Sequence, residues 1–277
     1  MAKPRMQDAS ECLISDRSSP SSSSRLTTDS WCELSIRPTT FLPAQHEASL
    51  VLPGPMEWTL WEALLLELRH QEPPMARVSN VTDPLILVRH GETEWSRTGR
   101  HTGRTDIALT DRGRNEASLV APTLAGWNFA HVFSSPLSRA LDTAKLATND
   151  GDIIVDDIFM EWDYGPYEGR TNAEIQEAEP GWSKWDSDID GGESAHDVGV
   201  RCDQAIEQLV AASSDGPVLL FAHGHFLAIL IARWLGFDAT AGKRFIMQTA
   251  TVSQLGAKRS DHVLKTLNHR CGQVLAP

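Results

Sequence analysis

Arginine and histidine side chains stand at the ends of several apolar runs in this chain. The segment "LVRHGETEW" places Arg89 and His90 after one run, and "FAHGH" places His223 after another. Between them, "SSPLSRA" carries Arg139, and "MEWDYGPYEG" carries Glu161 among aromatic residues. Core packing gives no reason for cationic pairs at strand ends, so these residues are candidates for chemistry.

Two arginines, two histidines and one carboxyl group suit phosphoryl transfer through a phosphohistidine. A neutral imidazole, with an ordinary pKa of about 6.5, is a good nucleophile near neutral pH. Guanidinium groups grip phosphate oxygens in pairs and neutralise their charge. A carboxylic acid would protonate the leaving alkoxide and then, as carboxylate, take a proton from the attacking water. Burial among aromatic rings would favour the neutral acid form of Glu161.

Strands alternate with helices in the part of the chain that carries these residues. Strands are predicted at 84–88, 131–135, 152–155 and 217–225. Helices are predicted over 111–124 with Thr110 as N-cap, over 137–147 with Ser135 as N-cap and Pro136 as first residue, over 194–213, and over 226–236. This alternation favours an α/β fold, a three-layer α/β/α sandwich with a mostly parallel central sheet. Ligands bind such sheets beyond the carboxyl ends of the strands.

The long predicted helix at 194–213 has a clear apolar face. Val198, Cys202, Ile206 and Leu209 recur at helical spacing and are expected to pack on the sheet.

The chain divides by composition into unequal parts. Residues 1–55 are rich in serine and proline and are predicted to be disordered, and 56–74 read as a short amphipathic helix and a linker. That helix would either pack on the main domain or dock a partner. The catalytic domain is placed at 76–277, and translation starting at Met75 is an alternative.

Composition limits the partners. The 277 residues are 41% hydrophobic and carry a formal charge of −12, without a basic face that would favour nucleic acid. Four scattered cysteines fit a reducing cytoplasm, and no apolar run reaches the roughly 18–20 residues of a membrane span. No glycine-rich nucleotide-binding motif occurs. A small phosphorylated metabolite is the expected partner, with no nucleic acid or membrane, for a cytoplasmic monomer or homodimer.

The four segments quoted above, taken in their order along the chain, resemble the signature segments of the histidine phosphatase superfamily, which is also called phosphoglycerate mutase-like. The resemblance covers about residues 84–268. It implies that His90 is the phosphorylated nucleophile, that Glu161 is the proton donor, and that a phosphoglycerate mutase-like fold holds them. It further implies phosphate contacts from Arg89, Arg139, His223, Gly224, Ser96 (where many relatives carry asparagine), and Thr102 and Gly103 in "GRHTGRTD".

Within that family the sequence favours a phosphatase over a mutase. Mutases carry an arginine directly after the acidic residue, and this chain has Trp162. Residues 171–200 form a short acidic segment with one lysine and no arginine, where mutases insert a long basic one. The closest resemblance is to a subgroup with actinobacterial acid phosphatases and fungal sedoheptulose bisphosphatases. A metal-independent phosphatase without a cofactor is expected. A cofactor-dependent mutase, or a non-catalytic module that docks a partner through residues 1–74, are the alternatives.

Several further residues have two interpretations each. Trp182 and Trp185 would stack on a substrate or pack on a helix, and Glu193 and Ser194 would contact the substrate. Arg100 and Arg104 would reach a second phosphate or remain solvated. His225, with His223, forms an H-x-H pair; we expect His225 to support the site rather than bind a metal.

Overall fold

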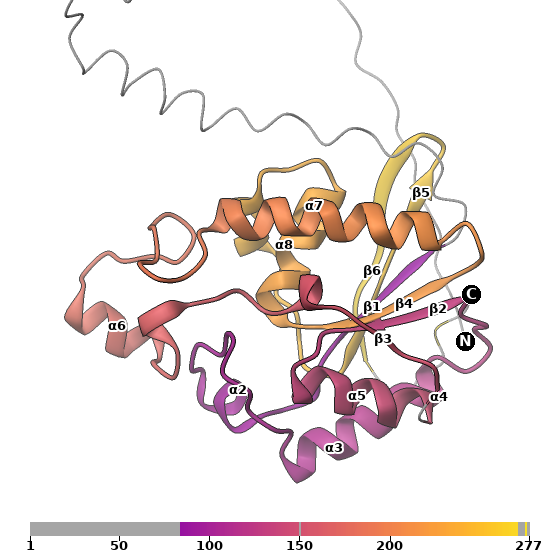
Figure 1. Ribbon diagram of the computed structural model, residues 1–277, viewed down its shortest axis with the longest axis horizontal. Coiled ribbons are helices and arrows are strands. Elements are labelled where there is room, and N and C mark those ends of the chain that lie inside the picture. The colour runs from indigo at the N-terminus through magenta and orange to yellow at the C-terminus, as the bar shows by residue number, and fades with distance from the viewer. Residues whose placement is uncertain (1–83, 150, 271–274, 276–277) are drawn as a thin grey trace, which may run out of the picture. The chain divides into compact units, whose positions relative to one another are not determined.

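The computed structural model describes residues 84–149, 151–270 and 275 (Figure 1). The predictions for 1–55 and 56–74, and the alternative start at Met75, lie outside the described residues.

A six-stranded sheet organises the described part of the chain. Its order is β3-β2-β4-β1-β5-β6. The strands are β1 (Leu85–Arg89), β2 (His131–Ser134), β3 (Ile154–Val155), β4 (Val218–Ala222), β5 (Thr251–Lys258) and β6 (Asp261–Arg270). The first four pair in parallel, and β5 and β6 add an antiparallel hairpin beside β1. Strands lie at all four predicted positions, but β3 covers only the second half of the predicted 152–155. The strand predicted at 217–225 ends at Ala222, because Gly224 and His225 already belong to the helix that follows. The hairpin had no prediction.

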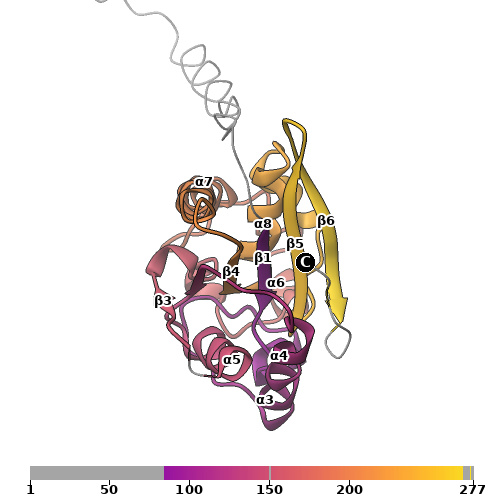
Figure 2. The same ribbon diagram turned by 90° about the vertical axis from the view of Figure 1, so that its right-hand side faces the viewer.

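Helices cover both faces of this sheet. The helices α7 (Ala195–Ala212) and α8 (Gly224–Trp234) lie on one face (Figures 1 and 2). On the other face lie α3 (Asp111–Ser118), α4 (Val120–Thr123) and α5 (Ser138–Thr148). Successive residues of β1 point to opposite faces of the sheet, each of which has a hydrophobic core. Leu85 and Leu87 pack in the core with α7 and α8, and Ile86 and Val88 pack in the core with α4 and α5. Two buried faces explain why β1 reads as an unbroken apolar run, and the predicted three-layer architecture is confirmed.

The predicted helix over 111–124 is in fact two helices that break at Leu119. Thr110 caps α3 as predicted, with its side chain accepting a hydrogen bond from the N–H of Gly113. Pro122 explains the break, because its ring conflicts with the carbonyl of Ser118 four residues earlier in a continuous helix.

The predicted start of the next helix is wrong by two residues. Helix α5 begins at Ser138 with Leu137 as N-cap, so neither Ser135 nor Pro136 has the predicted role. The side chain of Asp106 caps the helix from a distant part of the chain, accepting hydrogen bonds from the Ser138 N–H (2.9 Å) and hydroxyl (2.8 Å). The Ser135 hydroxyl accepts a hydrogen bond from the Leu137 N–H at 3.3 Å and can make a second contact.

Helix α7 agrees with its prediction. Ser194 is the N-cap in a capping box with Asp197, and the predicted apolar face is fully buried. No helix among the described residues is long and apolar enough to span a bilayer. The remaining elements are α2 (Glu94–Thr98), η1 (Asp157–Phe159), η2 (Gly165–Tyr167), α6 (Asn172–Ala178) and η3 (Ala239–Arg244).

Candidate active site

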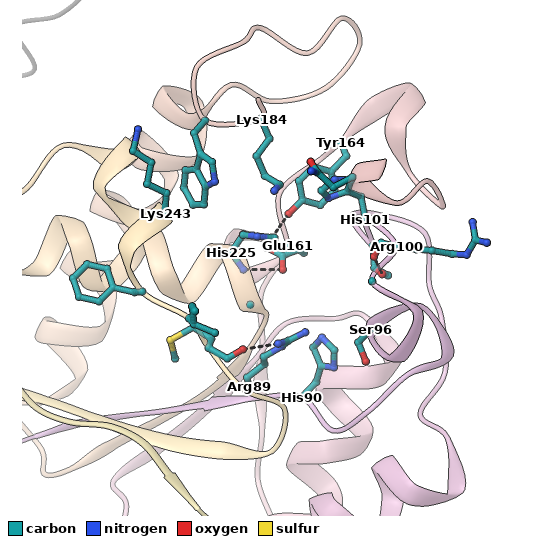
Figure 3. Close-up of a pocket in the computed structure, with 18 residues that line it drawn as sticks. Arg89, His90, Ser96, Arg100, His101, Glu161, Tyr164, Lys184, His225 and Lys243 are labelled. Atoms are coloured by element: carbon teal, nitrogen blue, oxygen red, sulfur yellow. Dashed lines mark hydrogen bonds between the residues drawn. The ribbon is translucent and has the colours of Figure 1, made fainter. Parts of the chain in front are cut away.

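A cavity of about 390 Å³ lies beyond the carboxyl ends of β1 and β4 (Figure 3). The residues proposed from the sequence that line it are Arg89, His90, Ser96, Thr102, Glu161 and Gly224. Parallel pairing brings the strand ends together, since Arg89 stands opposite Ala222 in the β1–β4 register. The edge predicted from strand order is thus the edge where the cavity lies.

The His90 imidazole is held in one tautomer. Its Nδ1 lies 2.7 Å from the carbonyl oxygen of Gly91, which can only accept, so Nδ1 carries the proton. Burial, followed by the charges of Arg89 and Arg139, lowers the pKa of His90 well below its ordinary value. The ring is therefore neutral near pH 7, with the Nε2 lone pair free to attack an electrophile.

The glycine after His90 is required by close backbone packing. A Cβ atom at Gly91 would lie 2.3 Å from the carbonyl oxygen of Gly113, and a Cβ at Gly113 would lie 2.0 Å from the carbonyl of Glu92. The N-terminal turn of α3 can approach the loop that follows His90 only because both glycines lack side chains.

The Arg89 guanidinium is partly engaged and partly free. Its Nη1 donates to the Met247 carbonyl at 2.5 Å, whereas its Nε is buried and has no hydrogen-bond partner among the described residues. A Cβ atom at Gly224 would lie 3.2 Å from the guanidinium carbon, so the glycine makes room for this group. A buried donor without a partner is costly, and an anionic ligand oxygen in the cavity would satisfy it.

The Glu161 carboxylate lies at the N-terminus of α8. It accepts hydrogen bonds from the backbone N–H groups of Trp162 (2.9 Å), His225 (3.1 Å) and Phe226 (2.8 Å). The side chain is 5% exposed, and these three backbone donors fix it in the cavity wall.

Arg139 and His223 lie behind the cavity and do not line it. Both are fully buried, and the Arg139 Nε donates to His223 Nδ1 at 3.2 Å. His223 Nε2 therefore carries the proton and donates to the Ser135 hydroxyl at 2.8 Å. The rings of His90 and His223 have centroids 5.3 Å apart. Sequence reasoning missed Ser135 as a partner of His223, because it assigned this residue to a helix cap.

The Arg139 guanidinium also holds the loop at Thr102 to Thr105. It donates to the carbonyls of Gly103 (2.8 Å) and Thr105 (3.0 Å). A Cβ atom at Gly103 would lie 2.2 Å from the carboxylate of Glu168, which binds the backbone N–H of Arg104 and Thr105. Thr102 lines the cavity, whereas Gly103 supports it from outside.

The Ser96 hydroxyl lines the cavity but is already engaged. It accepts a hydrogen bond from the Thr93 N–H (2.9 Å) and donates to the Thr93 carbonyl (3.0 Å) in the capping box of α2.

Glu193, Ser194 and Arg104 are absent from the residues that line the cavity. Glu193 accepts hydrogen bonds from Nε and Nη2 of Arg201, both at 2.9 Å, and from Nη2 of Arg104 at 3.3 Å. Ser194 caps α7. The segment "GGES" therefore leads into the start of a helix.

The two tryptophans have different environments. Trp182 is buried against Tyr167, with ring centroids 4.5 Å apart. Trp185 lines the cavity and contacts Trp162 edge to face. Arg100 also lines the cavity, but it forms an ion pair with Glu174 at 3.6 Å.

Further residues line the cavity without having been singled out as contacts, among them Tyr164, His101, Lys184 and Lys243. The Tyr164 hydroxyl lies 2.5 Å from Nδ1 of His225, which also lines the cavity. Within the described part of the chain, no group of three or more His, Cys, Asp or Glu side chains converges as a metal site requires.

Comparison with known proteins agrees with this geometry. Acid phosphatase from Mycobacterium tuberculosis is 41% identical over 188 residues, 66% of this chain and 91% of that protein. Sedoheptulose 1,7-bisphosphatase from Saccharomyces cerevisiae is 32% identical over 57% of this chain and 69% of that protein. The solved structure of mycobacterial glucosyl-3-phosphoglycerate phosphatase with VO3 is 32% identical, with a TM-score of 0.61, covering 68% of this chain and 100% of that chain.

The family match itself covers residues 85–270, which include all the cavity residues named above. The chain belongs to branch 1 of the histidine phosphatase superfamily.

Proposed function

We propose that this protein is a phosphomonoesterase that hydrolyses small phosphorylated metabolites through a phosphohistidine on His90. One observation carries the proposal. Three groups line the same cavity. They are the neutral imidazole of His90 with a free Nε2, the Arg89 guanidinium, whose buried Nε has no hydrogen-bond partner among the described residues, and the fixed carboxyl group of Glu161. Two of the similar proteins are named as phosphatases that act on phosphorylated sugars or sugar derivatives.

In the first step, Nε2 of His90 attacks phosphorus while the bond from phosphorus to the ester oxygen breaks. The Arg89 guanidinium neutralises the phosphoryl oxygens and keeps their charge from repelling the nucleophile. Glu161, protonated, gives its proton to the departing alkoxide, which leaves as an alcohol. The products are the phosphohistidine, the alcohol and the Glu161 carboxylate.

In the second step, that carboxylate takes a proton from a water molecule, whose oxygen attacks phosphorus. The bond between phosphorus and Nε2 breaks, releasing inorganic phosphate and restoring the neutral imidazole and the acid. Arg139 and His223 support this reaction from behind the cavity, by holding the loop at Thr102 to Thr105 and packing near His90.

The residue that follows Glu161 supports the mutase alternative less well than it supports a phosphatase. Trp162 is fully buried, and its indole N–H donates to the Glu193 carbonyl at 2.7 Å, so it offers no cation to a substrate carboxylate. A mutase also needs to retain a bisphosphorylated intermediate against hydrolysis.

The full-length protein and a His90→Ala variant test the proposal. We expect phosphate release in EDTA from an aryl phosphate and from at least one of sedoheptulose 1,7-bisphosphate, fructose 1,6-bisphosphate and 3-phosphoglycerate. The variant should lose at least about 10³-fold in kcat, because the nucleophile is gone. An alkali-quenched reaction with phosphoryl-labelled substrate should label the wild type alone.

Three results would contradict the proposal. Activity that EDTA abolishes would argue for a metal-dependent reaction. The protein would be a mutase if it isomerised phosphoglycerate after priming with its bisphosphate, without net release of phosphate. No reaction in either assay would favour the non-catalytic binding module.

A further inference from the structure

Four cationic side chains line the cavity, and they differ in whether a carboxylate neutralises them. Arg100 pairs with Glu174, and Lys243 pairs with Asp186, each at 3.6 Å. Arg89 and Lys184 have no carboxylate within ion-pair distance in the described part of the chain. Arg89 is accounted for by the phosphoryl group, so Lys184 is the cation that the proposed reaction leaves without a counter-ion.

Lys184 is held in place by anchored neighbours. It lies in the segment between α6 and α7, where Trp182 and Ile189 are buried in the core. Trp185, next in the chain, packs edge to face on Trp162 and on His225. A lysine fixed between two anchored tryptophans loses less side-chain entropy on binding a ligand than one on a mobile loop.

The direction of Lys184 places it across the cavity from the nucleophile. Figure 3 shows its ammonium end pointing toward Glu161 and Tyr164, while Arg89 and His90 lie at the opposite wall. A phosphomonoester with phosphorus at His90 and its ester oxygen at Glu161 would extend its alcohol part toward Lys184. Burial lowers the pKa of Lys184, and Glu161 opposes that effect, so an anion beside the ammonium would relieve a desolvation cost.

We propose that Lys184 binds a second anionic group, a carboxylate or a phosphate, on the alcohol part of the substrate. The inference rests on the proposed function for the direction of the bound ester. It gives the one lysine of the acidic segment a role in selecting phosphomonoesters with two anionic ends over those with one.

Binding to the full-length His90→Ala protein tests this inference without turnover. Calorimetry at pH 7 would compare two matched pairs: 3-phosphoglycerate with glycerol 3-phosphate, and fructose 1,6-bisphosphate with fructose 6-phosphate. We expect the doubly anionic member of at least one pair to bind about tenfold or more tightly, as a charge-assisted hydrogen bond gives. The pair that shows the preference identifies the second group as a carboxylate or a phosphate.

Substitutions at Lys184 then locate the preference. Added to the same protein, Lys184→Met should remove the tenfold preference while changing binding of the singly anionic member less than about threefold. Lys184→Arg should retain most of it, and Lys145→Met, an exposed lysine in the last turn of α5, should change neither ligand.

The inference is overturned if neither pair shows a preference, or if the preference survives Lys184→Met. A preference that depends on Lys184 in a wild-type protein without phosphatase activity would support the anion site and refute the proposed function. Phosphatase activity without that preference would support the proposed function and refute the anion site at Lys184.

Discussion

Arg201 ties together the segments that carry Glu161, and its removal gives a measurable prediction. The guanidinium binds both carboxylate oxygens of Glu193 at 2.9 Å. It also donates to the carbonyls of Ile158 (2.9 Å), Met160 (2.6 Å) and Glu161 (3.3 Å). Its side chain is 14% exposed, so these bonds are largely shielded from water.

Substituting methionine at this position keeps an unbranched apolar stem, shortens the side chain and removes every donor. Breaking a buried ion pair by removing one partner costs about 3–5 kcal/mol. Glu193 would keep its contacts with Arg104 and the Asp163 N–H, so the lower end, about 3 kcal/mol, applies. For a domain of this size that loss corresponds to a fall in Tm of about 6–12 °C.

The matched control is Arg97→Met. Arg97 also pairs with a glutamate, Glu94, at 2.6 Å, but the two side chains are 57% and 53% exposed. An exposed pair contributes under about 1 kcal/mol, so Tm should stay within about 3 °C of the wild type. Thermal unfolding of the three proteins in the same buffer makes the comparison, and equal Tm values for both variants would refute the reasoning from burial.

Activity separates a positioning role of Arg201 from a purely structural one. If Arg201 positions Glu161, the proposed proton donor, the variant should lose more kcat on an alkyl phosphate than on a nitrophenyl phosphate. The nitrophenolate leaves without much help from an acid, whereas an alkoxide needs its proton. Equal losses on both substrates at a temperature where the variant is folded would leave Arg201 a structural role only.

Three further predictions concern protonation and close packing. Burial and the charges of Arg89 and Arg139 hold the pKa of His90 well below its ordinary value, so kcat should fall less than about threefold between pH 6.5 and pH 5. Over the same range the neutral fraction of an ordinary imidazole falls about 15-fold. A loss of about 15-fold in kcat in a pH–rate profile would contradict this prediction. Burial lowers the pKa of His101 to about 4, so the unfolded state binds more protons than the folded state between pH 6.5 and pH 4. The free energy of unfolding should therefore decrease by up to about 3 kcal/mol as the pH falls through that range. Denaturant titrations at several pH values should show a smaller decrease for His101→Phe, and an equal decrease in the variant would contradict this prediction. In Gly224→Ala the added methyl group would lie 3.2 Å from the Arg89 guanidinium. The inhibition constant for vanadate should rise about tenfold, while Tm stays within about 3 °C of the wild type. An unchanged inhibition constant would show that this contact does not set the position of Arg89.

Local patterns in the sequence were enough for the framework of this protein. The apolar run before Arg89 indicates a strand buried on both faces, and Thr110 indicates the start of a helix, because both signals depend on near neighbours in the chain. The apolar spacing of 194–213 likewise predicts the buried face of α7. Strand-end positions then predict that His90 and Glu161 share a site, since parallel strands place their carboxyl ends at one edge.

Features set by distant contacts could not be predicted in this way. The hairpin of β5 and β6 turns through Arg259 and Ser260, with Arg259 at a φ of 59°, and this pair lacks the asparagine–glycine signal of tight hairpins. The start of α5 is set by Asp106, which lies 32 residues before Ser138 in sequence.

The direction of individual side chains at the site also depended on the tertiary structure. Ser135 turns to His223 and Glu193 turns to Arg201, where the sequence suggested a helix cap and a substrate contact. Lys184 reads as a single cation in an acidic segment, yet it lines the cavity. Sequence by itself determined which residue types meet at the sheet edge, because strand order and strand ends fix backbone positions. Only the tertiary structure decided which of them face the cavity, because the packing of distant segments sets the rotamer and the partner of each side chain.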